Sequence, residues 1–184
     1  MKRVPCLLPA LLAACGGGNP LDNPDSVSNP ATSGDGRALS FVYFQACVQP
    51  VLTTPVPGPG GSNTCAGAGC HDSRSGTGGA LRLDGAATAV DPALPADQLR
   101  TTAMYRNFVS AQGVTVIGNA TASLLLAKPR LAGVLHGGGL IFDGDSSATQ
   151  RLTFWISRPM PAGQDEFSAA GQALLGADGA CRTE

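Results

Sequence analysis

Cys65-Ala66-Gly67-Ala68-Gly69-Cys70-His71 is the stretch of the chain that says most about its chemistry. Two cysteines lie in a loop of small residues, and a histidine follows the second cysteine directly. Thiol and imidazole groups are metal ligands, and two thiols can also join in a disulfide. The stretch therefore predicts a site of covalent or metal chemistry, around which the rest of the chain has to be interpreted.

The Cys70-His71 ending is typical of c-type haem attachment, in which two thioethers hold the porphyrin and the histidine binds its iron. This interpretation assigns Cys65 and Cys70 to the covalent bonds and His71 to the iron. Four residues separate the cysteines, whereas the usual motif has two. The intervening Ala and Gly residues suit a loop that lies against the porphyrin edge, because they carry no bulky side chain.

Other interpretations of the same residues stay open. Cys65 and Cys70 can form a short-loop disulfide in an oxidising compartment. They can also join His71 and one further ligand in a Cys2His2 zinc site, although the usual zinc-finger spacings are absent. The Cys70-His71 dipeptide can also occur by chance.

The composition predicts one domain with a thin hydrophobic core. The chain has 184 residues, and apolar residues make up 43% of it, but aromatic residues only 5%. It also contains 25 Gly and 14 Pro. A buried porphyrin would supply the apolar surface that such a core lacks. Charged residues amount to 14% and the net charge is −1, which gives no basis for nucleic-acid binding.

Residues 1–15 resemble a bacterial lipoprotein signal peptide. Lys2 and Arg3 precede a short apolar run, and Leu12-Ala13-Ala14-Cys15 resembles a lipobox in which Cys15 is lipidated. The run is too short to span a membrane, so the lipid would be the anchor. An ordinary signal peptide cleaved nearby is the alternative. Gly16 after the cysteine resembles lipoproteins of the outer membrane, which predicts a location in the bacterial cell envelope, facing the periplasm.

Residues 16–39 are expected to be a disordered tether, because Gly, Pro, Asn, Asp and Ser dominate and few residues are apolar. A folded domain is expected from residue 40, with residues 53–64 and 73–79 as loops and a short extended piece at 113–118. Ser40 is a candidate N-cap, and Pro50 is expected to end the first helix. The predicted helical segments are residues 40–49, 95–109, 123–127, 145–158 and 168–175.

The order of these motifs resembles the single-haem cytochrome c fold, and more narrowly the planctomycete-type cytochrome c-like domain. The resemblance covers about residues 40–158. The segments that carry it are 44–51, 65–71, 78–83, 123–126, 136–139 and 155–156. It implies a mainly α fold, a small helical domain with long Gly/Pro-rich loops, and residues 159–184 as a tail packed back on it. The widened cysteine spacing and the Pro/Gly insert before it depart from the family pattern.

The resemblance puts His71 on the proximal side of the iron and leaves the distal ligand to be chosen. His136 is favoured, because the distal ligand of this fold comes from the loop before the last helix. Gly residues at 137–139 would let the backbone pass close to the ring. Met160 is the runner-up, but it follows the last helix of the domain, and Met104 is expected in the core. A solvated loop histidine is the alternative for His136.

Cys47 and Cys181 remain once the other cysteines are assigned, since Cys6 leaves with the signal peptide. Two leftover cysteines in an exported chain predict a disulfide, and both lie beside helices that are expected to meet.

The sequence predicts a membrane-anchored electron carrier with one covalent haem c, which exchanges electrons with redox partner proteins. Catalytic motifs are missing, so an enzyme is not expected, apart from weak peroxidase-type activity. Two alternatives stay open. One is a structural module held by zinc or by a disulfide, and the other is a haem ligand sensor with an open sixth position.

Overall fold

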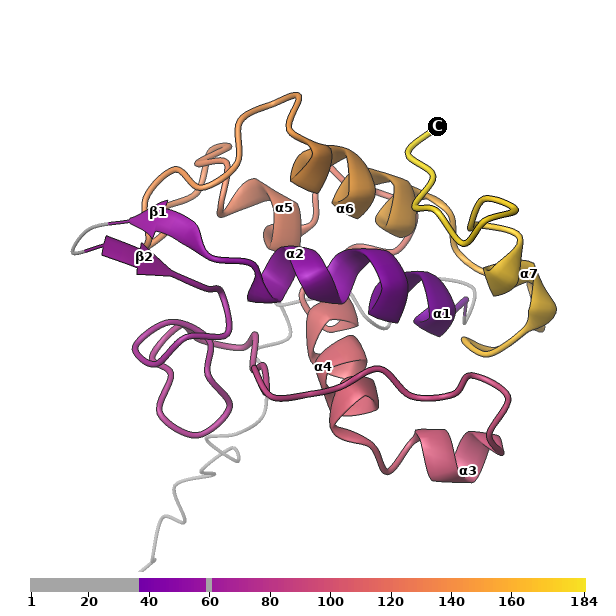
Figure 1. The fold of residues 1–184 in the computed structure, drawn as a ribbon. Coiled ribbons are helices and arrows are strands. Elements are labelled where there is room, and N and C mark those ends of the chain that lie inside the picture. The colour runs from indigo at the N-terminus through magenta and orange to yellow at the C-terminus, as the bar shows by residue number, and fades with distance from the viewer. Residues whose placement is uncertain (1–36, 59–60) are drawn as a thin grey trace, which may run out of the picture.

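The computed structural model describes residues 37–58 and 61–184, so the predicted signal peptide, Cys15 and most of the tether lie outside the described residues. The regular structure is mostly helical and includes one small hairpin, while long loops make up much of the chain (Figure 1). This confirms the helical character and the long loops expected from the sequence. None of the helices in the described part is long and apolar enough to cross a membrane.

The elements follow one another in this order: α1 Phe41–Tyr43, the π-helical turn η1 Phe44–Val48, α2 Gln49–Thr53, β1 Val56–Gly58, β2 Gly61–Asn63, α3 Ala96–Leu99, α4 Ala103–Gln112, α5 Leu124–Ala127, α6 Ser147–Ser157 and α7 Ala169–Gln172. β1 and β2 form an antiparallel pair in which Val56 lies opposite Asn63. The hairpin occupies part of the stretch that was expected to be loop.

The first helix continues through Pro50, so the prediction that Pro50 ends it was wrong. Ser40 caps the helix as expected, accepting a hydrogen bond from the Tyr43 N–H. The helix then widens into η1, where the Gln49 N–H bonds to the Phe44 carbonyl. Pro50 thereby falls in the first turn of α2, where a missing N–H costs little. A helix with this interruption runs on to Thr53.

The predicted helix at 95–109 is two helices, α3 and α4, so that prediction was wrong in its continuity. Thr102 is extended and accepts a hydrogen bond from the Tyr105 N–H, which makes it the N-cap of a new helix. α4 then runs to Gln112, beyond the expected end. No strand forms at 113–118, where the structure has turns and a single bridge between Val116 and Asn119.

The folded part begins before residue 40, which corrects the predicted end of the tether. Leu39 is fully buried, and its N–H donates to the Gln112 side chain. The Ala38 carbonyl accepts from the Met160 N–H at 2.8 Å. These contacts fix the chain at its entry into the core.

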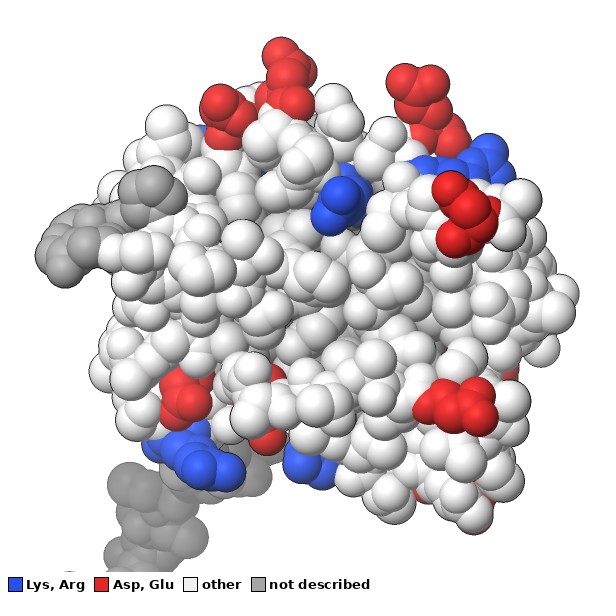
Figure 2. Space-filling model, viewed as in Figure 1, with Lys and Arg blue, Asp and Glu red and all other residues white. Residues whose placement is uncertain are grey.

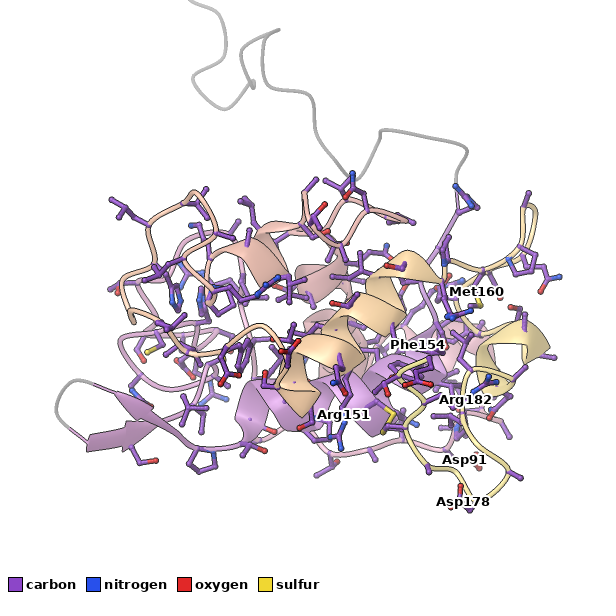
Figure 3. The ribbon with its side chains drawn as sticks, turned by 90° about the horizontal axis from the view of Figure 1, so that it is seen from above. Asp91, Arg151, Phe154, Met160, Asp178 and Arg182 are labelled. Carbon is purple, nitrogen blue, oxygen red and sulfur yellow. A yellow bond between two sulfur atoms is a disulfide. The ribbon has the colours of Figure 1, made fainter. Side chains whose placement is uncertain are left out.

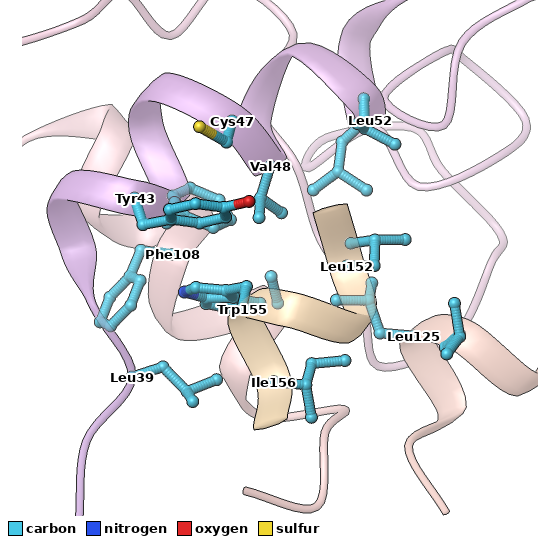
Figure 4. Packing of buried hydrophobic residues seen from close by; sticks show 14 of the residues in the cluster. Leu39, Tyr43, Cys47, Val48, Leu52, Phe108, Leu125, Leu152, Trp155 and Ile156 are labelled. Atoms are coloured by element: carbon cyan, nitrogen blue, oxygen red, sulfur yellow. The ribbon is translucent and has the colours of Figure 1, made fainter. Parts of the chain in front are cut away.

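The core forms where the first helix lies between α6 and α4 (Figure 1). Trp155 of α6 is fully buried, and its indole N–H donates to the Ser40 carbonyl at 2.9 Å. Its ring packs on Phe44 and Phe108 at centroid distances of 5.4 and 6.1 Å. Figure 4 shows the leucines and Ile156 that continue this cluster along α6. α6 itself begins at Ser147, within the predicted segment 145–158, and Ser146 is its N-cap.

The C-terminal tail packs back on the first helix, as the sequence predicts. Cys47 and Cys181 form a disulfide, which joins η1 to the tail. The Phe41 N–H donates to the Glu166 carbonyl, and Phe167 packs edge-on against Phe41 at 5.3 Å. Figure 3 shows Met160 and Arg182 at the end of the molecule where α7 lies, far from the hairpin.

We expect Trp155→Phe to lower the free energy of unfolding by about 1–3 kcal/mol, because it removes the bond to the Ser40 carbonyl and leaves a void. Urea unfolding followed by far-UV circular dichroism measures this without relying on the lost indole. Val109→Ala, on an exposed position of α4, is the control and should change stability by less than about 0.5 kcal/mol. An equally small effect of Trp155→Phe would contradict the assignment of this contact.

We expect the Cys47→Ala/Cys181→Ala double variant to lose about 2–5 kcal/mol of unfolding free energy, because the disulfide closes a loop with a sequence separation of 134 residues. The matched comparison adds a reductant to the wild type and to the double variant. The reductant should destabilise the wild-type chain and leave the double variant unchanged. A double variant as stable as the oxidised wild type would show that the disulfide adds nothing.

Candidate functional site

The loop from Cys65 to His71 is a compact series of turns after β2. The His71 N–H donates to the Cys65 carbonyl at 2.9 Å, and the Cys70 N–H donates to the Gly67 carbonyl at 3.0 Å. Gly69 has a φ of +81°, a conformation that glycine adopts readily. The loop therefore folds on itself and holds both cysteines and the histidine together.

A second segment, Leu81 to Leu83, orients the His71 ring. The Leu83 N–H donates to the His71 carbonyl at 2.7 Å, and His71 Nδ1 lies 3.2 Å from the Leu81 carbonyl oxygen. A carbonyl can only accept, so Nδ1 carries the proton and Nε2 presents its lone pair. Burial lowers the pKa of His71, outweighing the effect of this hydrogen bond. Its imidazole is thus kept neutral, which is the form that binds metals.

His136 has the same arrangement on a different loop. Its Nδ1 lies 2.9 Å from the Gly139 carbonyl oxygen, so its Nε2 is also the free nitrogen. The Gly139 N–H donates back to the His136 carbonyl at 2.9 Å, and Gly139 has a φ of +73°. The base of this loop is fixed where the N–H groups of Ile141 and Phe142 donate to the Pro129 carbonyl.

The two imidazole rings lie close together and nearly parallel. Their centres are 6.4 Å apart and their planes differ by only 9°. Metal–imidazole bonds of about 2.0–2.1 Å, with each bonding nitrogen about 1.1 Å from its ring centre, separate two rings on opposite sides of one metal by about 6.3 Å. The spacing of His71 and His136 therefore fits two axial ligands of a single metal ion.

Two adjoining cavities open at this pair, and both histidines line both of them. The larger cavity has a volume of about 640 Å³, within the range of cofactor sites in proteins. The smaller one, of about 80 Å³, is mostly apolar; the side chains that form its apolar wall are Leu52, Leu81, Val114, Leu124, Leu125 and Phe142. The pair thus stands between an apolar pocket and a wider space.

Cys65 and Cys70 are both free thiols at the edge of this space. Cys65 lines both cavities, and Cys70 lines the larger one. Burial, with a smaller contribution from Cys70, raises the pKa of Cys65 to about 11, so its thiol is neutral. The Asn63 side-chain amide donates to Cys70 Sγ at 3.6 Å. Both sulfurs are therefore placed beside the space between the imidazoles.

The described residues contain no group of three or more His, Cys, Asp or Glu side chains arranged to hold a metal ion. A haem needs only two axial ligands from the protein, because the porphyrin supplies the others. The structure does not bring Met160, the runner-up ligand, to either cavity. After α6 the chain turns towards α7, and the Met160 sulfur accepts a hydrogen bond from the Ser168 hydroxyl. Met104 is buried in the core.

Three residues at the site were not predicted from the sequence to take part in it. Gly78 lies directly against the His71 ring, Leu81 supplies the carbonyl that orients it, and Lys128 is a cation beside both histidines. The Leu81 and Gly78 segment was noticed only as a family motif. Lys128 stands next to Pro129 after a short helix, and no local pattern marks it as part of a site.

No protein-family model matches this chain, and searches among curated proteins and solved structures find no match. The resemblance to cytochrome c-like domains therefore depends only on the motifs of the sequence and their order. The case for a haem site depends on those motifs and on the geometry of the two histidines.

We expect Gly78→Ala to disturb the site, because an added Cβ would lie 2.5 Å from His71 Nδ1 and 2.7 Å from the Cys70 carbonyl oxygen. Overpacking of this kind costs about 1–3 kcal/mol of stability. The control is Gly85→Ala, whose Cβ would come no closer than 3.4 Å to any atom, the nearest being the Ala66 Cβ. Chemical unfolding of both variants measures the difference. Equal stability would contradict the close packing of Gly78 on His71.

Proposed function

We propose that this chain is an electron-transfer protein with one covalently attached c-type haem, anchored in the bacterial cell envelope by a lipid at Cys15. The observation that carries the proposal is the His71–His136 pair, with parallel rings 6.4 Å apart and both Nε2 atoms free. Cys65 and Cys70, the two thiols expected to hold a porphyrin, border the same space.

The residues of the site suit a bound redox group whose position should not change when its charge changes. Each Nδ1–H bonds to a backbone carbonyl, which fixes the tautomer and the orientation of the ring. His71 would bind from the cysteine loop and His136 from the opposite loop. When bound, the haem would supply one-electron chemistry at its iron. Rings held in place in this way would reduce the rearrangement that accompanies electron transfer.

The walls of the site would help to set the reduction potential. The apolar wall, which includes Leu52 of α2 and Leu125 of α5, excludes water from one side of the histidine pair. A less polar environment disfavours the extra positive charge of the oxidised state. Two imidazoles act in the other direction, because a methionine ligand gives a higher potential than a histidine. The proposal therefore predicts a potential below that of His/Met cytochromes.

The remaining parts of the proposal come from the sequence. An export signal fits covalent haem, which is attached outside the bacterial cytoplasm. The lipid would keep the domain at the membrane, where redox partner proteins can reach it. Two alternatives would replace the proposal: a zinc site, or a haem iron with an open sixth position. The following experiment distinguishes both from the proposed function.

The test is the absorbance spectrum of the full chain, oxidised and reduced, together with its intact mass. We expect a Soret band, the added mass of one haem, and a low-spin ferric spectrum. His136→Ala should keep the haem and turn the spectrum high-spin, because one axial ligand is lost. Met160→Leu, the control, should leave the spectrum unchanged.

Three results would overturn the proposal. A protein that carries zinc and no iron would be the zinc module, and a protein with neither haem nor metal would be a structural module. A haem protein whose spectrum is the same in His136→Ala and wild type would have an open sixth position and would fit a ligand sensor instead.

A further inference from the structure

Among the described residues that line the two cavities, Lys128 is the one that carries a charge. It lies at the C-terminal end of α5 and borders both cavities together with His71 and His136. Charged residues make up only 14% of the chain, and Figure 2 shows them dispersed among many uncharged residues on the face in view. A cation inside a largely apolar site is therefore an exception that calls for an explanation.

The ammonium group of Lys128 has no anionic partner among the described residues. Neither an ion pair nor a side-chain hydrogen bond involves it, and no Asp or Glu lines either cavity. The side chain is half-buried. Proteins generally pair a charged group that lies at a largely apolar site. The arrangement thus leaves room for an anion that comes with a ligand.

The surroundings of Lys128 indicate where such an anion would lie. The smaller cavity is mostly apolar, whereas the larger cavity is also lined by Asn63, Thr64 and Thr77. The Asn63 amide and the Thr64 hydroxyl can donate to a carboxylate, whereas the Thr77 hydroxyl already donates to the Gly69 carbonyl at 2.9 Å. Lys128 and His71 line the same two cavities, so the cation is close enough to act on a metal that His71 would hold.

We propose that the Lys128 ammonium pairs with a carboxylate of the bound ligand, a propionate of the porphyrin, and raises the reduction potential of the iron. This inference depends on the proposed haem function and adds a positioning residue to it. A lysine ammonium is a compact point charge that suits a single carboxylate. A positive charge near the iron disfavours the oxidised state, which carries one more positive charge than the reduced state.

The experiment compares Lys128→Met and Lys128→Arg in the haem-loaded full chain by redox titration. Lys128→Met keeps the length of the side chain and removes its charge. We expect it to shift the balance towards the oxidised form by about threefold to tenfold, or about 30–60 mV for one electron. Lys128→Arg should stay close to the wild type. Arg106→Met, which removes an exposed cation of α4 that lines neither cavity, is the control for a general charge effect.

Amine labelling distinguishes the source of the anion. Lys2 and Lys128 are the only lysines of the chain, so acetylation at Lys128 can be followed directly by peptide mass spectrometry. We expect Lys128 in the haem-loaded protein to react at least about tenfold more slowly than in the same protein in denaturant, whether or not acetate or phosphate is added. Protection that appears only with added acetate or phosphate would identify a free anion and overturn the propionate assignment.

Three other outcomes would contradict the proposed role of Lys128. A haem-loaded Lys128→Met protein with the wild-type potential would refute the role of Lys128 and leave the proposed function standing. A chain that never acquires haem would overturn both. A shift as large in Arg106→Met would show a general charge effect and would contradict the pairing.

Discussion

The site depends on two imidazole rings that backbone carbonyls hold parallel, with centres 6.4 Å apart. Each ring donates its Nδ1 proton to a backbone carbonyl, that of Leu81 for His71 and that of Gly139 for His136. Each ring therefore leaves its Nε2 free. The two rings come from loops more than sixty residues apart in the sequence. Their spacing is therefore a tertiary property, and it can persist only if the framework that carries the loops is rigid.

That framework is the crossing of the first helix with α6 and α4. The same helix that buries Phe44 against Trp155 ends in α2, where Leu52 lines the smaller cavity. The Ser40–Trp155 hydrogen bond and the disulfide from Cys47 fix this helix from two sides. The core contains seven of the chain's nine aromatic residues, and it supports one wall of the site directly. Packing and proposed chemistry thus share residues of one element.

Local signals were predictable from the sequence, and signals that depend on distant contacts were not. The cap at Ser40 was correct, because a cap is decided within one helical turn. Pro50 was misjudged, since the π-helical turn that accommodates it requires packing of the whole helix. The cysteine loop was found from adjacent residues, and His136 from the order of motifs. Gly78 and Lys128 were missed, because only the folded chain brings them to the histidines.

X-ray absorption at the metal edge of the purified full chain tests the central claim most directly, because it identifies both the metal and its ligand atoms. The account predicts iron with nitrogen ligands on both faces of the porphyrin and no sulfur ligand, since His71 and His136 would bind it from opposite sides. Zinc in place of iron, or iron with a sulfur ligand, would contradict the account.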